Sequence, residues 1–343
     1  MAATLTITSD SLQATVQDLG RGGYLGDGIP PSGAFDSLSL RLANLLVGND
    51  PGDRCLVGRR PGAAGLEVAL GLIALKVSED SVTAVTGAEA EVTVDDEPCP
   101  MWESFLLPAE GILRIGRTRS AARVYVALNG GIDVPEMLGS RATNPRARLG
   151  GHQGRTLRNG DTLQLFASPG PPGEHVGRVV QEDLRPRLQP RWELGVILGP
   201  QSHLFTDESV ELFLSTEWQL SQLADRMGCR FVGPPLQFKP RPDYLVSQAG
   251  SDPSNIVDDV TPLGGIQVPS GLEPIAMGVD FPSIGGYAKI ATVISAHLPR
   301  LGQMRPGDPA RFRAYEVEDA VEELRATTDG VADWVTSRPT ERA

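Results

Sequence analysis

The chain has few cysteines and histidines for its 343 residues. Its cysteines are odd in number and far apart, so they give neither a disulfide framework nor the close pairing of a zinc site. No histidine lies three or four residues from another, which favours ordinary surface or loop positions over a metal site. The residues concerned are Cys55, Cys99, Cys229, His152, His175, His203 and His297. We therefore predict reduced thiols and no metal site.

Excess positive charge and long apolar runs are also lacking. The net charge of -12 argues against a surface that neutralises the phosphates of nucleic acid or of anionic lipid. No stretch approaches the roughly 18 uninterrupted apolar residues of a membrane span, and no signal-peptide pattern follows Met1. These absences predict a cytoplasmic protein that has neither nucleic acid nor membrane as a partner.

The familiar catalytic signatures are missing as well. The sequence contains no GxxxxGK[ST] phosphate loop, no strand-linked GxGxxG motif, no HExxH and no GxSxG. A complete nucleophile, metal or phosphate-loop site therefore cannot be assembled from this sequence. We expect the isolated chain to be inactive.

The composition and the patterning favour a mainly β fold. The 39 glycines and 28 prolines suit many short strands joined by tight turns. Runs such as 75–77, 82–86 and 124–128 are rich in β-branched or alternating apolar residues. Helices are predicted after Asp36, where leucines from 38 to 46 share one face, and from Glu318 to Ala326.

A Pro-rich stretch interrupts the pattern in the middle of the chain. We predict an N-terminal domain over 1–168, a linker over 169–190, a C-terminal domain over 191–315 and a helical tail over 316–343. Both predicted domains end in a similar turn before a short strand. The two turns are Arg158-Asn159-Gly160-Asp161 and Arg305-Pro306-Gly307-Asp308. Either the chain contains a duplicated domain or a Gly-Asp turn recurs by chance.

Polar groups in a Gly/Pro-rich loop form the first candidate site. The loop runs from Gln17 to Asp36 and carries Asp18, Arg21, Ser32 and Asp36. Rigid loops with fixed polar groups suit contacts with a ligand or another protein. The alternative is structural: Asp36 caps the following helix, while Asp18 and Arg21 form an internal ion pair or a turn-forming pair.

Two further segments carry candidate anion-binding groups. Asp225 precedes Arg226, whose guanidinium suits a carboxylate or a phosphate, although a surface ion pair is the alternative. Gly285 and Gly286 stand four and three residues before Lys289, as in a phosphate-binding nest with an added point charge. The alternative there is a turn with an exposed lysine before a strand.

Long motifs in a fixed order carry a family resemblance from Thr15 to Phe312. The matching motifs are TVQDLGR (15–21), PPSGAFD (30–36), RLANLLVGN (41–49), NGGIDVP (129–135), LGSRAT (138–143), DRMG (225–228), GIQVP (265–269) and GGYAKIA (285–291). With these motifs the chain resembles the family called allophanate hydrolase subunit 2 or the C subunit of 5-oxoprolinase (KipA-like, biotin-dependent carboxyltransferase-like).

The resemblance implies two cyclophilin-like β-barrel domains with a few short helices. It also implies one subunit of a complex that hydrolyses 5-oxoproline to glutamate with ATP and Mg. The expected partners are a small cyclophilin-like subunit (allophanate hydrolase subunit 1, KipI-like) and a third subunit of the LamB/YcsF type. Two other roles stay open: a regulatory partner of a kinase-inhibitor-like small subunit, and an accessory subunit in urea or allophanate metabolism.

Residues near the implied ATP-dependent site follow from these motifs. We expect Asp225 and Lys289 to be catalytic and a second set to bind substrate or nucleotide. The second set is Asp18, Arg21, Ser32, Asp36, Arg226, Gly285, Gly286 and Tyr287. One departure concerns this site: relatives carry Gln-Thr-Thr before Gly-Gly-Tyr, whereas this chain has Pro282-Ser283-Ile284. That change removes an amide and hydroxyl donors, which is consistent with a different small amide substrate or a mainly structural role.

Overall fold

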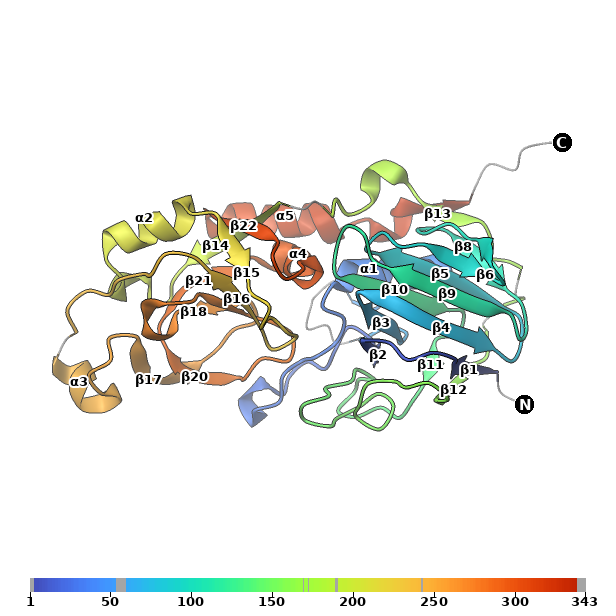
Figure 1. Ribbon diagram of the computed structural model, residues 1–343, viewed down its shortest axis with the longest axis horizontal. Coiled ribbons are helices and arrows are strands. Elements are labelled where there is room, and N and C mark those ends of the chain that lie inside the picture. The colour runs from blue at the N-terminus through green and yellow to red at the C-terminus, as the bar shows by residue number, and fades with distance from the viewer. Residues whose placement is uncertain are drawn as a thin grey trace. The chain divides into compact units, whose positions relative to one another are not determined.

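A computed structural model describes residues 3–53, 60–168, 170–171, 173–188, 191–241 and 243–337 (Figure 1). Contacts divide the chain into two compact units. The first unit comprises residues 1–22, 32–188 and 328–343, and the second comprises 23–31 and 189–327. The chain thus passes between the units after residues 22, 31, 188 and 327. Cys55 lies outside the described residues.

Two antiparallel sheets form the first unit, in the orders β11-β12-β1-β4-β9-β6-β7 and β2-β3-β10-β5-β8. The strands of the larger sheet are β1 (Thr4–Ile7), β4 (Gly71–Val77), β6 (Val92–Val94), β7 (Glu97–Pro98), β9 (Ile112–Arg117), β11 (Ile132–Asp133) and β12 (Thr162–Leu165). Those of the smaller sheet are β2 (Gln13–Gln17), β3 (Gly65–Ala69), β5 (Ser81–Gly87), β8 (Ser104–Leu107) and β10 (Arg123–Leu128).

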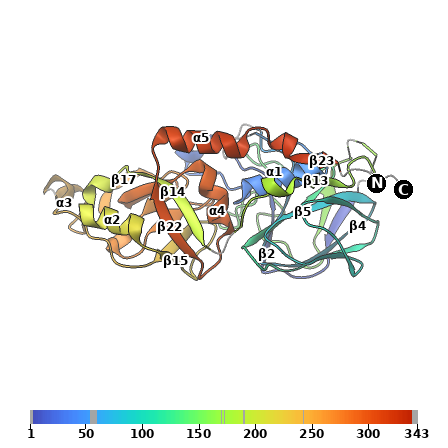
Figure 2. The same ribbon diagram turned by 90° about the horizontal axis from the view of Figure 1, so that it is seen from above.

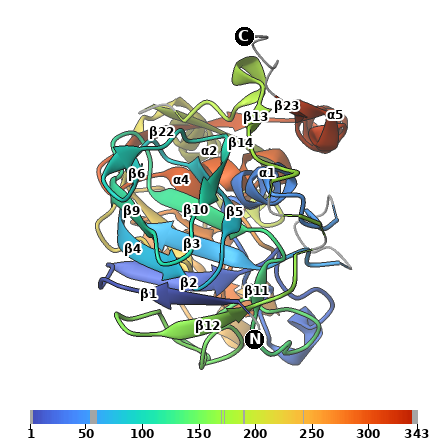
Figure 3. The same ribbon diagram turned by 90° about the vertical axis from the view of Figure 1, so that its right-hand side faces the viewer.

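The helix α1 (Ser37–Leu46) covers β5 and β10 of the smaller sheet (Figure 3). Asp36 caps it, because its carboxylate accepts a hydrogen bond from the Ser39 amide at 3.0 Å. Leu42 and Leu46 are fully buried in the core between the helix and the sheet. The leucine spacing therefore predicts this helix correctly.

A short antiparallel ribbon joins distant parts of the sequence within the first unit. It consists of β13 (Arg178–Val180) and β23 (Val335–Ser337), with Val179 opposite Thr336. The strand β13 and the turn η2 (Glu182–Leu184) come from the stretch for which the sequence predicts a linker. Residues after the predicted second helix thus contribute a strand to the first unit.

The second unit is built on a closed seven-stranded barrel in the order β14-β21-β18-β19-β16-β15-β22 (Figure 2). Its strands are β14 (Trp192–Leu198), β15 (Trp218–Leu220), β16 (Gly228–Val232), β18 (Gly265–Gln267), β19 (Ile275–Met277), β21 (Lys289–Val293) and β22 (Pro309–Ala314). A separate ribbon pairs β17 (Asn255–Val260) with β20 (Ile284–Tyr287). The prediction of a mainly β chain with barrel architecture is confirmed.

Helices are few and short in the second unit. They are α2 (Asp207–Ser215), α3 (Asp243–Ala249), α4 (Leu298–Gln303) and α5 (Val317–Thr328). Single 3-10 turns are η1 (Leu25–Asp27), η3 (Ser202–Leu204), η4 (Pro269–Gly271) and η5 (Ser295–His297), with η6 (Val331–Trp334) in the first unit. The predicted helix from Glu318 to Ala326 is found as α5.

Aromatic side chains fill the barrel between α2 and β22. The Phe213 ring stacks on Phe312 with centroids 4.5 Å apart, and Phe231 meets Phe312 edge-on at 5.1 Å. All three rings are at most 2% exposed. This close packing gives the barrel a rigid interior on which loops can hold polar groups in fixed positions.

Residues 23–31 leave the first unit and pack on the second. Leu25 in η1 lies against an apolar cluster of Ile275, Met277 and Phe281. No helix among the described residues is long and apolar enough to cross a membrane.

Candidate functional site

Asp18 is fully buried in the first unit. Its carboxylate accepts hydrogen bonds from the Ser140 hydroxyl at 2.7 Å and from the amides of Arg141 and Gly20 at 2.6 and 2.8 Å. Burial raises the pKa of Asp18, although these hydrogen bonds and the charge of Arg21 act in the opposite direction. The residue thus ties the loop after β2 to residues 140–141.

The other candidates of the first loop are also built into the first unit. The Arg21 guanidinium is 2% exposed and donates to the Ala142 carbonyl. Ser32 is 2% exposed, and its hydroxyl accepts a hydrogen bond from the Asn144 amide at 3.2 Å. Asp36 is the helix cap that the structural alternative describes. Asp18 and Arg21 make internal contacts with residues 140–142, so these side chains hold the loop in place.

Asp225 and Arg226 behave differently from each other in the second unit. Asp225 is exposed, and its carboxylate accepts bonds from the amides of Met227 at 2.8 Å and Gly228 at 3.2 Å. Arg226 is 4% exposed and forms a bidentate ion pair with Asp280, with N–O distances of 2.8 and 3.3 Å. The structure thus shows a turn-forming Asp225 and a buried rather than surface ion pair at Arg226.

Lys289 starts the barrel strand β21 and has no exposed surface, so the alternative of an exposed lysine is wrong. Its ammonium lies 3.1 Å from a carboxylate oxygen of Asp259, a residue of β17. The same oxygen accepts a hydrogen bond from the Gln201 side chain at 3.1 Å. The Gln201 amide also donates to the Lys289 carbonyl at 3.0 Å, and the Lys289 amide donates to the Gln201 side-chain oxygen at 3.2 Å. We call Gln201, Asp259 and Lys289 the lysine cluster.

Gly285 and Gly286 lie in the strand β20 and do not form the expected nest. Gly285 stands opposite Asp259 in the ladder between β17 and β20. A side chain there would come within 2.4 Å of the Gln267 amide nitrogen, so a larger residue would displace the Gln267 side chain. Tyr287 ends the strand and is 40% exposed. The glycines therefore let the ribbon approach the barrel beside the lysine cluster.

In the lysine cluster the carboxylate of Asp259 is partly exposed to solvent, whereas the ammonium of Lys289 is buried. The Asp259 side chain is 39% exposed, whereas that of Lys289 is not exposed at all. Burial favours a raised pKa of Asp259, but the hydrogen bonds from Lys289 and Gln201 outweigh it and the pKa lies below the usual value. At neutral pH this group is an oriented anion that can accept a hydrogen bond from a polar N–H group.

Sequence reasoning finds Lys289 but misses its partners. Asp259 and Gln201 lie 30 and 88 positions away in the sequence. The pairing of β17 with β20 brings Asp259 close to Lys289, and the pairing of β14 with β21 brings Gln201 close. Paired acids at 258–259 inside an apolar strand are the available signal for Asp259. Nothing in the local sequence distinguishes Gln201.

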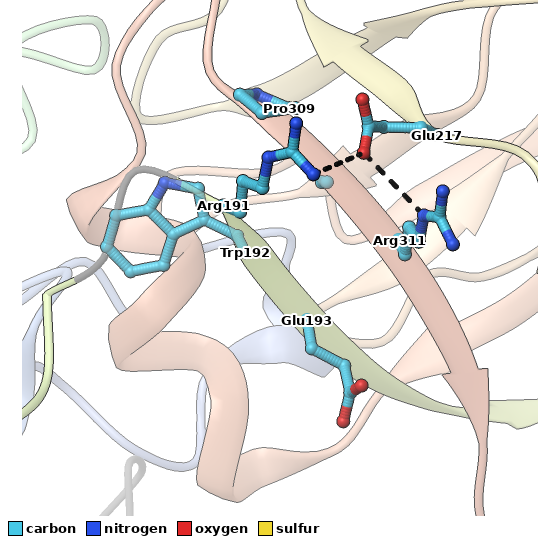
Figure 4. A pocket seen from close by; sticks show the side chains of 7 residues that line it. Arg191, Trp192, Glu193, Glu217, Pro309 and Arg311 are labelled. Carbon is cyan, nitrogen blue, oxygen red and sulfur yellow. Dashed lines mark ion pairs between the residues drawn. The ribbon is translucent and has the colours of Figure 1, made fainter.

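An open pocket of about 300 Å³ lies elsewhere on the barrel, between the starts of β14 and β22 (Figure 4). Arg191 and Arg311 both face Glu217 across it, with N–O distances of 4.0 and 3.6 Å. The two arginine side chains are 81% and 64% exposed, so the pairs are solvated and weak. None of the residues predicted for the site lines this pocket.

Comparison with known proteins identifies the family. Residues 27–314 match the model described as "Carboxyltransferase domain, subdomain A and B". The chain belongs to this family. Its members include proteins named as the C subunit of 5-oxoprolinase, so the resemblance found in the sequence motifs is confirmed.

Relatives in the family carry two kinds of name. The chain is 34% identical to the 5-oxoprolinase C subunit of Escherichia coli K12, and the match covers 92% of this chain and 93% of that protein. It is also 34% identical to urea amidolyase of Lachancea kluyveri, with 96% of this chain and 18% of that protein covered. The chain thus spans about a fifth of the length of the urea amidolyases that it matches.

Solved structures share the fold over nearly the whole chain. Urea amidolyase of K. lactis matches with a TM-score of 0.88 and 31% identity, covering 100% of this chain and 20% of that one. The protein TTHA0988 matches with a TM-score of 0.75 and 32% identity, covering 91% and 55%.

Proposed function

We propose that the chain is one subunit of an ATP-dependent complex that opens the lactam ring of 5-oxoproline to give glutamate. The supporting observation is how much of each relative is matched. The matched region comprises 93% of the E. coli 5-oxoprolinase protein but only 18% of the urea amidolyase. It therefore contains nearly everything that the 5-oxoprolinase protein provides, and only a small part of the other enzyme.

ATP suits this reaction because a lactam is a stable amide with a poor leaving group. Phosphorylation of the amide oxygen makes the ring carbon electrophilic enough for water to attack. The side chains expected to bind ATP do not form a polyphosphate site by themselves. Arg226 is paired with Asp280 and Lys289 with Asp259, so each cation is offset by a carboxylate. No group of three or more potential metal ligands occurs among the described residues.

We assign a narrower part to this chain within the complex. The oriented carboxylate of Asp259 accepts a hydrogen bond from the ring N–H of the lactam, while Lys289 keeps that carboxylate ionised and in place. The phosphate contacts then come mainly from the partners, a small cyclophilin-like subunit and a third subunit of the LamB/YcsF type. This division explains why the chain alone is expected to be inactive.

The experiment is turnover of the reconstituted complex, measured as release of ADP and of glutamate. Asp259→Asn and Lys289→Met are expected to lower turnover by about 10- to 100-fold, the range for one hydrogen bond to a charged group. Asp207→Asn is the matched control, since this carboxylate of the same unit is 89% exposed and pairs with Lys239 at the surface. Thermal melting of each variant separates lost chemistry from lost folding.

The possible outcomes have different meanings. Full turnover with Asp259→Asn would remove Asp259 from the reaction while leaving the lactam hydrolysis in place. Absence of ATP-dependent glutamate formation by the wild-type complex would refute the proposed activity. If the small subunit binds but no turnover follows, the regulatory role is favoured instead.

A second candidate is an accessory role in urea breakdown. It is favoured by the 0.88 TM-score to the K. lactis urea amidolyase over the whole chain. Adding a biotin-dependent carboxylase and measuring urea-dependent ATP hydrolysis tests it. Stimulation of that activity by the chain would support this role over lactam hydrolysis.

A further inference from the structure

The ribbon of β17 and β20 lies at the edge of the second unit (Figure 1). Several of its apolar side chains are exposed. Val260 and Ile284 lie directly opposite each other and are 66% and 57% exposed. Further exposed apolar residues stand on this ribbon and on the adjoining helix α3. They are Val257, Tyr287, Tyr244 and Val246. Exposed aliphatic cross-strand pairs in a separate ribbon are a feature of interaction surfaces.

The charge around these residues indicates which kind of molecule could bind the exposed ribbon. The segment 243–260 contains the acids Asp243, Asp252 and Asp258 besides Asp259, which is paired with Lys289. The nearby Arg241 is bound to backbone carbonyls of the same segment, so acids remain in excess. A membrane with anionic lipids and a nucleic acid are both disfavoured next to such a surface. A second copy of the chain, whose net charge is -12, would bring acid against acid. A protein surface with an apolar strip flanked by lysine or arginine fits both features.

The two faces of the ribbon have different partners. Gly285 and Asp259 point toward the barrel, where they meet Gln267 and Lys289. Asp258 lies on the opposite face with Val260, because side chains two positions apart in a strand share a face. Its carboxylate reaches over Gly286, at 2.9 Å from where a side chain would begin. A protein bound to the outer face would therefore rest on the strand that carries Asp259 to the lysine cluster.

We propose that the outer face of the β17–β20 ribbon, with Val260, Ile284 and Asp258 at its centre, docks a partner protein of basic and apolar character. This inference rests on the proposed function, in which the small cyclophilin-like subunit is the partner. Docking there places the partner against the strand that carries the Asp259 carboxylate.

The test is the affinity of the full-length chain for the small cyclophilin-like subunit, measured by titration calorimetry. The double variant Val260→Ser/Ile284→Ser is expected to weaken binding about tenfold or more, as loss of central apolar contacts does. Asp258→Lys is expected to weaken binding and to reduce its dependence on salt. Leu223→Ser is the matched control, because Leu223 is 72% exposed in the same unit but lies outside the ribbon.

Hydrogen exchange supplies a readout that does not need a variant. Amides of 255–260 and 284–287 are expected to become protected when the small subunit is added to the wild-type chain. Unchanged affinity in the double variant, or no added protection, would overturn the docking surface while leaving the proposed activity untouched. A wild-type chain that fails to bind the small subunit would overturn both proposals. Weakened binding by the variants without lactam turnover in the wild type would uphold the surface and refute the activity.

Discussion

Each unit has a similar turn directly before a strand, at residues 158–161 before β12 and at residues 305–308 before β22. In the first unit the Asp161 amide donates to the Arg158 carbonyl at 3.1 Å, and in the second the Asp308 amide donates to the Arg305 carbonyl at 2.9 Å. The glycine before each aspartate has a φ of 89° or 91°. Each aspartate also bonds through its backbone to a neighbouring strand, at Ile7 of β1 and at Leu220 of β15. A chance recurrence of Gly-Asp does not require this shared ladder, so the likeness favours duplication.

The carboxylates of the two turns have different partners. Asp161 holds the Arg155 guanidinium through two bonds of 2.7 and 2.8 Å. Asp308 accepts from the buried indole of Trp192 at 2.9 Å. Both also cap their own turn, by accepting from the amide three residues earlier. The backbone role is therefore common to both units, while the side-chain partner is particular to each.

The largest loss of stability is expected at Asp308, because its partner, the Trp192 indole, is buried and cannot bond to water instead. Asp308→Ala leaves the Trp192 indole and the Arg305 amide without their acceptor, which should cost about 3 kcal/mol of unfolding free energy. Asp308→Asn is the control, because its amide oxygen still accepts. Urea unfolding measures both variants. A loss below about 0.5 kcal/mol in Asp308→Ala would show that the indole bond contributes little.

A smaller effect is expected from pH at the other turn. The hydrogen bonds from Arg155 lower the pKa of Asp161 to about 2, although burial acts against them. Since the folded value lies below the unfolded one, this stabilisation is full above the unfolded pKa and is lost as pH falls toward 2. Wild-type protein should lose about 2 kcal/mol more than Asp161→Asn between pH 5 and pH 2. Parallel pH curves for the two proteins would contradict the strength of this pair.

The smallest loss of stability is expected at the two turn glycines, and it tests whether the backbones of the two turns are alike. Gly160→Ala and Gly307→Ala should each cost about 1 kcal/mol, because a side chain strains a backbone with positive φ. Neither added carbon would meet another atom within 4 Å, so strain is the common cause. Equal losses in urea unfolding are expected. A clear loss in only one variant would show that the turns differ in backbone as well as in side-chain partner.

Local patterns predict local structure well. Leucines at 38, 42, 45 and 46 predict α1, and the apolar stripe from 317 predicts α5. Turn glycines that adopt a positive φ, such as Gly160 and Gly307, also identify strand boundaries. In each case a few neighbouring residues determine the conformation, so the sequence window contains the physical cause.

The candidate site depends on ion pairs between residues that lie far apart in the sequence, which a short stretch of sequence cannot show. The local sequence presents Lys289 as an exposed cation after a Gly-Gly turn, because it shows neither Asp259 nor the barrel that buries the lysine. It likewise suggests the adjacent Asp225 as the partner of Arg226, whereas the structure pairs Arg226 with Asp280. Such partners are set by the pairing and register of strands that lie far apart in the sequence.

The four passages of the chain between units bear on the order of synthesis. The strand β23, which pairs with β13 of the first unit, is drawn from the end of the chain. Leu25 packs on Ile275 and Phe281 of the second unit, which are synthesised some 250 residues later. When the ribosome has released residues up to 188, the strand β23 of the first unit has not yet been made. The first unit is therefore completed only after residues 189–327 of the second unit have been synthesised.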